Sequence, residues 1–318
     1  MTKNVGAVKL QRNLDYSTRM NYRIFRFEAV VDFIEVRIHT TTRNRGGAMK
    51  RALHLHGISY VTPVQADSAG WASHFTTRLY DVKTHAALQS KLATIAEEFP
   101  FASPPVITMI EVAFDGYLRD GQENTNHDHL VALAARMVFR VAEPVSSNTR
   151  IYRDYKGSPT AMPRTLHSTE RKMVDGWGIA IGNKSDPEYE HGYFKTTDRG
   201  MPLAVRDYRA RFELRLAGAA LPHSSLESWA AFKFEKLTKR IRFRKEDDAA
   251  SPLQQVIVAG HADRASHRKS IKRQSGGGTR AHIMPADVEL DQIVYDQLRQ
   301  LSKRWMRVRK SASFTGEK

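Results

Sequence analysis

Apolar and polar residues alternate with the period of two that is typical of strands in several segments of this chain. The first segment, RFEAVVDFIEVRIHT at 26–40, is rich in β-branched and aromatic residues, which pack well on a pleated surface. Two shorter segments, WGIAIG and GYFKTTD, flank a predicted turn at 183–191. In chain order, the predicted strands cover residues 26–40, 73–82, 106–118, 177–182, 192–198 and 208–218.

A helical period is found between and after these segments. The clearest amphipathic helix is THAALQSKLATIAEEF at 84–99. Pro104 and Pro105 are predicted to end the connection that follows this helix, before the next strand begins. Helices are therefore expected at 48–57, 84–99, 127–142 and 225–245, and after Asp287, whose side chain would cap a terminal helix.

The charge of the chain is strongly positive. Its 50 Lys and Arg residues exceed 34 Asp and Glu residues, which gives a formal charge of +16 and a pI near 10.0. Such an excess indicates a partner rich in phosphate. Nucleic acid is favoured over a membrane because no apolar run approaches the roughly 18–20 residues that cross hydrocarbon. No signal peptide is recognisable and cysteine is absent, so we expect a cytoplasmic protein whose chemistry uses carboxylates, histidines and hydroxyls.

Composition divides the chain into four predicted parts. A polar, basic arm covers 1–23, one domain covers 24–245, a flexible basic linker covers 246–282, and a basic helical segment covers 283–318. The linker has too few apolar residues to build a core. We expect its cations to contact the backbone of DNA; they are Arg264, Arg268, Lys269, Lys272 and Arg273.

The strand at 106–118 carries two carboxylates on one face. Its alternation places Glu111, Ala113 and Asp115 together, with Phe114 and its apolar neighbours on the other face. One interpretation is a solvated outer surface. The other is a site for a hard cation, because carboxylate oxygens suit Mg²⁺ or Mn²⁺.

The strand at 208–218 presents a matching charged face. Arg209, Arg211, Glu213 and Arg215 alternate with apolar residues. If this strand neighbours the strand at 106–118, Glu213 would complete a metal site or act as a base, and Arg211 would contact phosphate. The alternative is simple pairing between arginines and carboxylates across the two strands.

In the segment GYFKTT, Tyr193 and Lys195 share one face of the predicted strand. A tyrosine beside a cation suits transfer of a DNA strand to the phenol oxygen. The cation favours loss of the phenol proton and neutralises charge in the transition state. The pair is common in proteins, so it gains weight only together with the two charged strands.

In combination, these segments resemble the Rep_trans type of replication initiation factors of rolling-circle plasmids and filamentous phages. The resemblance covers roughly residues 28–218 and rests on VVDFIEV with Asp32, IEVAFD, GNKSDPEYEHGYFK and RFELRL, in that order. Relatives more often have aspartate at the position of Glu111. The segment at 196–207 is the least matched stretch.

The resemblance implies an α+β fold with a five-stranded antiparallel central sheet and helices on one face, like the palm-like core of nicking enzymes. It implies that Tyr193 is the nucleophile that forms a 5′-phosphotyrosyl bond, with Lys195 beside it. Glu111 and Asp115 would serve a Mg²⁺ or Mn²⁺ ion, and we assign Asp32 and Glu213 to the same set. The partners would be double-stranded origin DNA and a single-stranded nick site, with a host helicase and polymerase and a homodimer also compatible.

Other motifs have competing interpretations. The pair His54 and His56 imitates a metal-binding His-x-His motif, but its neighbours favour a helix, which would point the imidazoles apart. His127 and His129 are better explained as surface histidines at the start of a helix. Tyr189 is four residues before Tyr193, which on a helix would pair two nucleophiles, but a turn into a strand makes Tyr189 a packing residue.

Two other functions are compatible with the same residues. A non-catalytic nucleic-acid-binding protein would use the carboxylates for structure alone. A metal-dependent nuclease would use water as the nucleophile and would never become attached to DNA.

Overall fold

The structure is a computed structural model of the 318-residue chain, and it describes residues 20–121, 127–137, 149–153, 172–198, 200–241, 243 and 287–307. Most of the predicted N-terminal arm and the predicted linker therefore lie outside the described residues. The same holds for the five linker cations: Arg264, Arg268, Lys269, Lys272 and Arg273.

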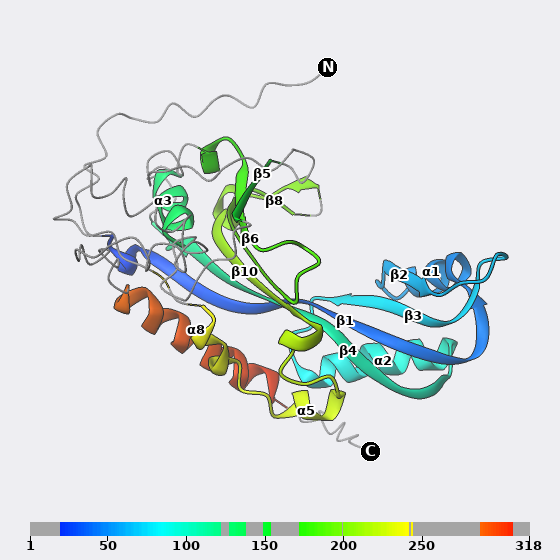
Figure 1. The fold of residues 1–318 in the computed structure, drawn as a ribbon. Helices are drawn as coiled ribbons and strands as arrows, with labels where there is room; N and C mark the ends of the chain where they lie inside the picture. The colour runs from blue at the N-terminus through cyan, green and yellow to red at the C-terminus, as the bar shows by residue number, and fades with distance from the viewer. Residues whose placement is uncertain are drawn as a thin grey trace, which may run out of the picture. The chain divides into compact units, whose positions relative to one another are not determined.

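Eight strands form one sheet in the order β2-β3-β1-β4-β10-β7-β6-β5, and β8 and β9 form a separate pair. Helices and 3-10 turns connect them (Figure 1). The strands are β1 (Phe25–Arg45), β2 (Tyr60–Val64), β3 (Trp71–Tyr80), β4 (Phe101–Leu118), β5 (Thr149–Arg153), β6 (Trp177–Ile181), β7 (Glu188–Lys195), β8 (Thr197–Asp198), β9 (Met201–Pro202) and β10 (Arg209–Ala217).

The helices are α1 (Gly46–His54), α2 (His85–Glu98), α3 (Asp128–Met137), α5 (Leu226–Ala230) and α8 (Val288–Trp305). The 3-10 turns are η1 (Tyr22–Ile24), η2 (Val205–Asp207), η3 (Gly218–Ala220) and η4 (Phe234–Lys239). None of the described helices combines the length and the apolar character needed to cross a membrane.

The predicted α+β class with an antiparallel central sheet is confirmed. Five strands were expected from the family resemblance, whereas the sheet has eight within the described residues. Two of the strands missed in the sequence, β2 and β5, lie at the two edges of the sheet. Pro63 disfavours a strand prediction for β2. An edge strand nevertheless tolerates proline, because its outer N–H groups need no partner.

Two predicted boundaries were wrong. Pro104 and Pro105 were expected to precede a strand, but β4 already begins at Phe101 and contains both prolines at positions that are exposed or half-buried. The segment 183–191 was expected to be a turn throughout, but β7 begins at Glu188. The turn is shorter and is closed by Asp186, whose Oδ2 accepts the N–H of Asn183 at 2.7 Å.

The chain divides into two compact units, and β1, β4, β10 and α8 contribute residues to both. Unit 2 comprises 29–112, 215–236 and 296–318, and unit 1 comprises the remaining residues. Figure 1 shows the long strands β1, β3 and β4 of unit 2 side by side, with α2 running along them.

The core of unit 2 follows from strand alternation. Cross-strand partners Ile34 and Leu79, and Ile38 and Phe75, are at most 1% exposed. Helix α2 buries Leu88, Leu92 and Ile95, whose spacing places them on one helical face. The first turn of this helix is capped by Thr84, as its Oγ1 accepts the N–H of Ala87 at 3.0 Å.

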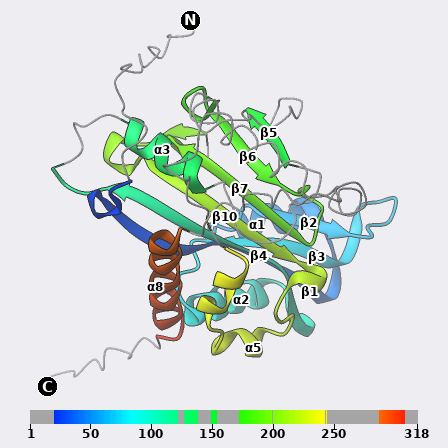
Figure 2. The ribbon, with the colours of Figure 1, turned by 60° about the vertical axis from the view of Figure 1, so that its left-hand side comes forward.

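The core of unit 1 is aromatic. Phe27 stacks on Phe114 at a ring distance of 5.4 Å, and Phe212 meets Phe243 edge to face at 5.4 Å. The strands β7, β6 and β5 follow one another in the sheet (Figure 2). The predicted cap of the terminal helix is confirmed, because Oδ1 of Asp287 accepts the N–H of Leu290 at 3.1 Å.

Asp287 also accepts a hydrogen bond from the hydroxyl of Tyr22, and both side chains are buried. Burial and the charge of Asp287 raise the pKa of Tyr22, so this phenol stays protonated as a donor. We expect Asp287→Ala to lower the free energy of unfolding by about 2 to 4 kcal/mol, since it removes a cap and leaves a buried hydroxyl unpaired. Urea denaturation would measure the loss. The double variant Tyr22→Phe, Asp287→Ala should lose less, and an equal or larger loss would contradict this account.

Candidate active site

Two ion pairs join the charged faces of β4 and β10. Nε and Nη2 of Arg211 each donate to one oxygen of Asp115 at 2.7 Å. Four residues away on each strand, Nε of Arg215 donates to Oε2 of Glu111 at 2.7 Å. The strands are neighbours in the sheet, which the predicted metal site required. The predicted alternative, pairing of arginines with carboxylates across the strands, is confirmed as well.

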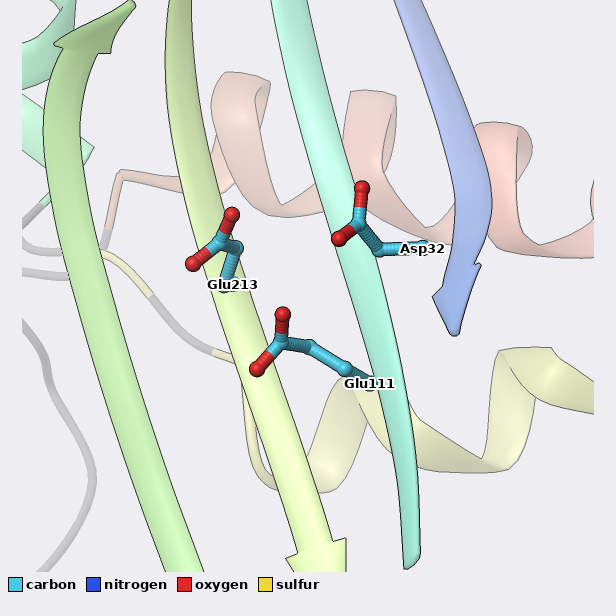
Figure 3. Close-up of side chains that lie close together, drawn as sticks. All are labelled: Asp32, Glu111 and Glu213. Carbon is cyan, nitrogen blue, oxygen red and sulfur yellow. The ribbon is translucent and has the colours of Figure 1, made fainter. Parts of the chain in front are cut away.

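Glu213 stands between these two ion pairs. It alternates with Arg211 and Arg215 along β10, so the three side chains share one face of the strand. Asp32 on β1, Glu111 on β4 and Glu213 on β10 each offer a carboxylate oxygen, and these atoms all lie within 4.8 Å of one another. Figure 3 shows the three carboxylates pointing toward one another. Of the four carboxylates assigned to a metal in the sequence, the structure brings these three together.

The hydroxyl of Tyr193 on β7 reaches the same Glu213. It donates to Oε1 of Glu213 at 2.7 Å. The ring of His191 stacks on the ring of Tyr193, with 4.5 Å between centroids, and Nδ1 of His191 lies 3.5 Å from Oε2 of Glu213. A phenol, an imidazole and a carboxylate are thus in mutual contact within unit 1.

His191 occupies a space that a glycine leaves open. Gly178 on β6 lies beside it, and a Cβ atom built at Gly178 would come within 2.2 Å of Nε2 of His191. Because a contact this short is impossible, any larger residue at position 178 would displace the imidazole. The backbone of β6 therefore sets the position of the ring that stacks on Tyr193.

The electrostatic surroundings keep Glu213 ionised. Burial alone would raise the pKa of its carboxyl, but hydrogen bonding by His191, the charge of Arg211 and the hydrogen bond from Tyr193 together lower that pKa to about 2. Glu213 is 5% exposed. A buried group that stays charged is a ready acceptor for a proton donor or a ligand for a cation.

This lowered pKa predicts a pH dependence of stability. The pKa in the folded protein, about 2, lies below the usual value of 4.5, so the stabilisation by ionised Glu213 is complete above pH 4.5 and is lost as the pH falls toward 2. We expect the difference in unfolding free energy between the wild type and Glu213→Gln to shrink across this range. Urea denaturation at several pH values measures it. A difference that stays constant from pH 6 to about pH 2 would contradict the assignment.

Asp115 is the carboxylate that the structure does not bring into the group of three. Besides its two bonds from Arg211, it has Nε of Arg209 at 3.5 Å from Oδ2, and the hydroxyl of Tyr117 donates to it at 3.4 Å. Burial and the charge of Asp115 raise the pKa of Tyr117 to about 12, which makes that phenol a poor nucleophile. Arg211 is 3% exposed, so its positive charge acts mainly on the buried carboxylates Asp115 and Glu213.

Lys195 shares a strand face with Tyr193, as predicted, and forms an ion pair. Its Nζ lies 2.7 Å from Oδ1 of Asp198, which follows three residues later. Burial would raise the pKa of Asp198, but the hydrogen bond and charge of Lys195 lower it. Lys195, the last residue of the strand that carries Tyr193, is thus held in place by Asp198.

The competing histidine motifs lie elsewhere. His54 ends α1 and His56 follows in a turn, where its Nε2 is 3.6 Å from Oε1 of Glu98. His127 precedes α3 and packs against Tyr208 with 5.1 Å between ring centroids. Within the ranges that the structure describes, Asp32, Glu111 and Glu213 are the group of three acidic or histidine side chains close enough to share a metal.

Sequence reasoning missed His191 because 183–191 was assigned to a turn. With β7 beginning at Glu188, a period of two places Tyr189, His191 and Tyr193 on one face of the strand. Tyr189 is 1% exposed and packs near His191, which confirms its predicted packing role. Glu190, in the same strand, is 2% exposed.

Comparison with known proteins assigns no family to this chain, so its function has to be inferred from the residues described above. No protein family model matches the chain, and no curated protein matches it. A solved structure described as "Structure of Rolling Circle Replication Initiator Protein from Geobacillus stearothermophilus" is similar at a TM-score of 0.32 and 10% sequence identity. The match covers 89% of this chain and 99% of that chain. Since a TM-score of this size carries no functional argument, the family resemblance stays a prediction.

Proposed function

We propose that this protein is a metal-dependent DNA strand transferase that nicks and rejoins one strand through Tyr193, in the initiation of rolling-circle replication. The observation that supports the proposal most is the 2.7 Å hydrogen bond from the Tyr193 hydroxyl to Glu213, because Glu213 also belongs to the group of three carboxylates. A nucleophile, its proton acceptor and a candidate cation site thereby share one residue.

In the proposed reaction, Oη of Tyr193 forms a bond to the phosphorus of a DNA phosphodiester, and the bond from phosphorus to the 3′ oxygen breaks. The phenol proton passes to Oε1 of Glu213, which already accepts the hydrogen bond, and is then available to the departing 3′ oxygen. Because the pKa of Glu213 is low, it holds the proton only in passing. Attack by a 3′ hydroxyl on the phosphotyrosyl bond reverses the step, so no nucleotide cofactor is required.

The group formed by Asp32, Glu111 and Glu213 fits a hard divalent cation, since all its ligands are carboxylate oxygens. Bound there, Mg²⁺ or Mn²⁺ would neutralise charge that develops on the phosphate oxygens in the transition state. Arg215 binds one of these carboxylates, Glu111, and so limits the negative charge of the group.

The other residues of the site have supporting roles in this proposal. His191 orients the phenol through ring stacking and holds Glu213 on its other oxygen. Arg211, fixed by Asp115, keeps Glu213 ionised, and Lys195 supplies positive charge on the strand face of Tyr193. Asp115 is therefore proposed to position Arg211, and not to bind the metal.

In its biological setting, the protein would bind a double-stranded origin, cut one strand at a single-stranded nick site and leave a 3′ hydroxyl for a host polymerase. The formal charge of +16 supports binding to nucleic acid. A host helicase and a second copy of the chain are further partners that such a reaction would accommodate.

The test is formation of a covalent adduct. The full chain would be incubated with Mn²⁺ and a labelled pool of single-stranded oligonucleotides of random sequence and analysed on a denaturing protein gel. We expect labelled protein with the wild type and none with Tyr193→Phe or after chelation of the metal. Tyr295→Phe, on the exposed side of α8, is the matched control and should form the adduct normally.

Each alternative function predicts a different outcome. Cleavage without an adduct, retained in Tyr193→Phe, would identify a nuclease that uses water. Binding without cleavage or adduct by any variant, on DNA that carries the chain's own nick site, would identify a non-catalytic binding protein.

A further inference from the structure

The outward face of β1, β3 and β2 in unit 2 carries rings and cations that the proposed reaction does not use. One side of these strands is fully buried, because Val36 and its cross-strand partner Thr77 are both 0% exposed. Alternation therefore places the intervening pairs on the other side, where Arg37 and His74 are exposed and Glu35 is covered. These outward pairs on β1 and β3 are Glu35 with Arg78, Arg37 with Thr76, and His39 with His74.

Two aromatic rings hold the guanidinium of Arg78 on this face. Its Cζ lies 4.9 Å from the ring centre of Phe33 and 4.4 Å from that of Tyr60 on β2. Its Nε donates to Oε2 of Glu35 at 2.9 Å. The acidic residue at these outward positions is thus neutralised, so it does not repel a polyanion.

The next positions along the strands present a pair of imidazoles. His39 and His74 are cross-strand partners, and their rings are nearly parallel, 4.1 Å apart with an angle of 8°. His74 is exposed and His39 is half-buried. Arg37, the neighbouring outward residue on β1, is exposed as well. The accessible part of the face therefore combines the paired rings of His39 and His74 with the cation of Arg37.

We propose that this outer face of β1, β2 and β3 binds single-stranded DNA, an inference that rests on the proposed function for the choice of DNA. Flat rings stack with the faces of unpaired bases, and arginines contact the phosphates between them. A duplex would fit poorly, because the major groove admits one helix or a two-stranded ribbon, whereas this face is three strands wide.

The face is connected to the candidate active site within unit 2. The guanidinium of Arg215 lies 5.5 Å from the ring centre of Phe33 and binds Glu111. Phe33 in turn lies under Arg78. Phe33 and Glu111 are each 3% exposed, so Arg215 joins the outer face to the carboxylate Glu111 through buried contacts.

Fluorescence anisotropy would test the proposal with the full chain and a labelled single-stranded oligonucleotide of 20 thymidines, in EDTA so that no cleavage occurs. We expect the double variant Arg37→Ala, His74→Ala to bind about tenfold more weakly. The slope of log affinity against log salt should fall by about 0.7, because one phosphate contact is lost. Lys83→Ala, an exposed cation just before α2 in the same unit, is the control and should bind as the wild type does.

Three results would overturn the proposal: unchanged affinity in the double variant, an equal loss of affinity for a duplex, or tighter binding of the matching RNA. Circular dichroism melting of the double variant excludes misfolding as the cause of a loss, since both residues are partly or fully exposed. The outcome is separate from the nicking reaction. Loss of binding in this variant would support the proposed DNA-binding face even if no protein-DNA adduct were ever formed. An adduct together with unchanged binding would support the nicking reaction and overturn the proposed DNA-binding face.

Discussion

Replacing Glu213 with glutamine is expected to reduce formation of the covalent DNA adduct at least 100-fold. The variant keeps the shape of the side chain but loses the charge that accepts the proton of Tyr193 and that joins Asp32 and Glu111 in holding a cation. The initial rate of adduct formation with Mn²⁺ measures the effect. Affinity for Mn²⁺, followed by electron paramagnetic resonance, should fall as well.

The matched control is Glu227→Gln, which removes an exposed carboxylate at the start of α5 and should leave both the rate and the affinity unchanged. Tyr193→Phe separates the two roles of Glu213, because it removes the nucleophile and should still bind Mn²⁺. A Glu213→Gln variant that forms the adduct within threefold of the wild-type rate would show that neither role is required.

Replacing Arg211 with methionine is expected to have the largest effect on stability. The guanidinium is 3% exposed and gives both oxygens of Asp115 a hydrogen bond, and Asp115 is itself 1% exposed. Removal of the cation leaves a buried carboxylate without its main partner, which costs about 3 to 5 kcal/mol. Urea denaturation monitored by circular dichroism would measure the change.

The double variant Asp115→Leu, Arg211→Met distinguishes a buried ion pair from simple loss of packing. Removing both charges should restore most of the stability lost in the single variant, because an apolar pair needs no charge partner. A double variant that is less stable than Arg211→Met would contradict this explanation.

Much of the fold was predictable because alternation and helical period are local properties of the sequence. The faces of β4 and β10 were assigned correctly, so Glu111 and Glu213 were placed on charged faces before the strands were known to be neighbours. Edge strand β2 was missed because it is short and contains Pro63, and its stability comes from pairing with β3. Such pairing is a long-range property that no local pattern reports.

The candidate site was predictable in part for the same reason. Local patterns identified Tyr193 and the carboxylates, but they could not decide which carboxylate an arginine would bind. Asp115 and Arg211 were assigned to different roles, whereas they form one ion pair. His191 was missed because Pro187 and the acidic residues around it are typical of a turn, and only the pairing of β6 with β7 makes that segment a strand.

The central claim is that Tyr193 becomes bonded to DNA, and mass spectrometry of the adduct tests it most directly. After nuclease digestion and trypsin cleavage, Tyr189 and Tyr193 lie on one peptide, residues 185–195, between two lysines. The account predicts that fragmentation places a nucleotide phosphate on Tyr193. A phosphate on Tyr189, on another peptide, or on no peptide of a protein that still cleaves DNA would contradict it.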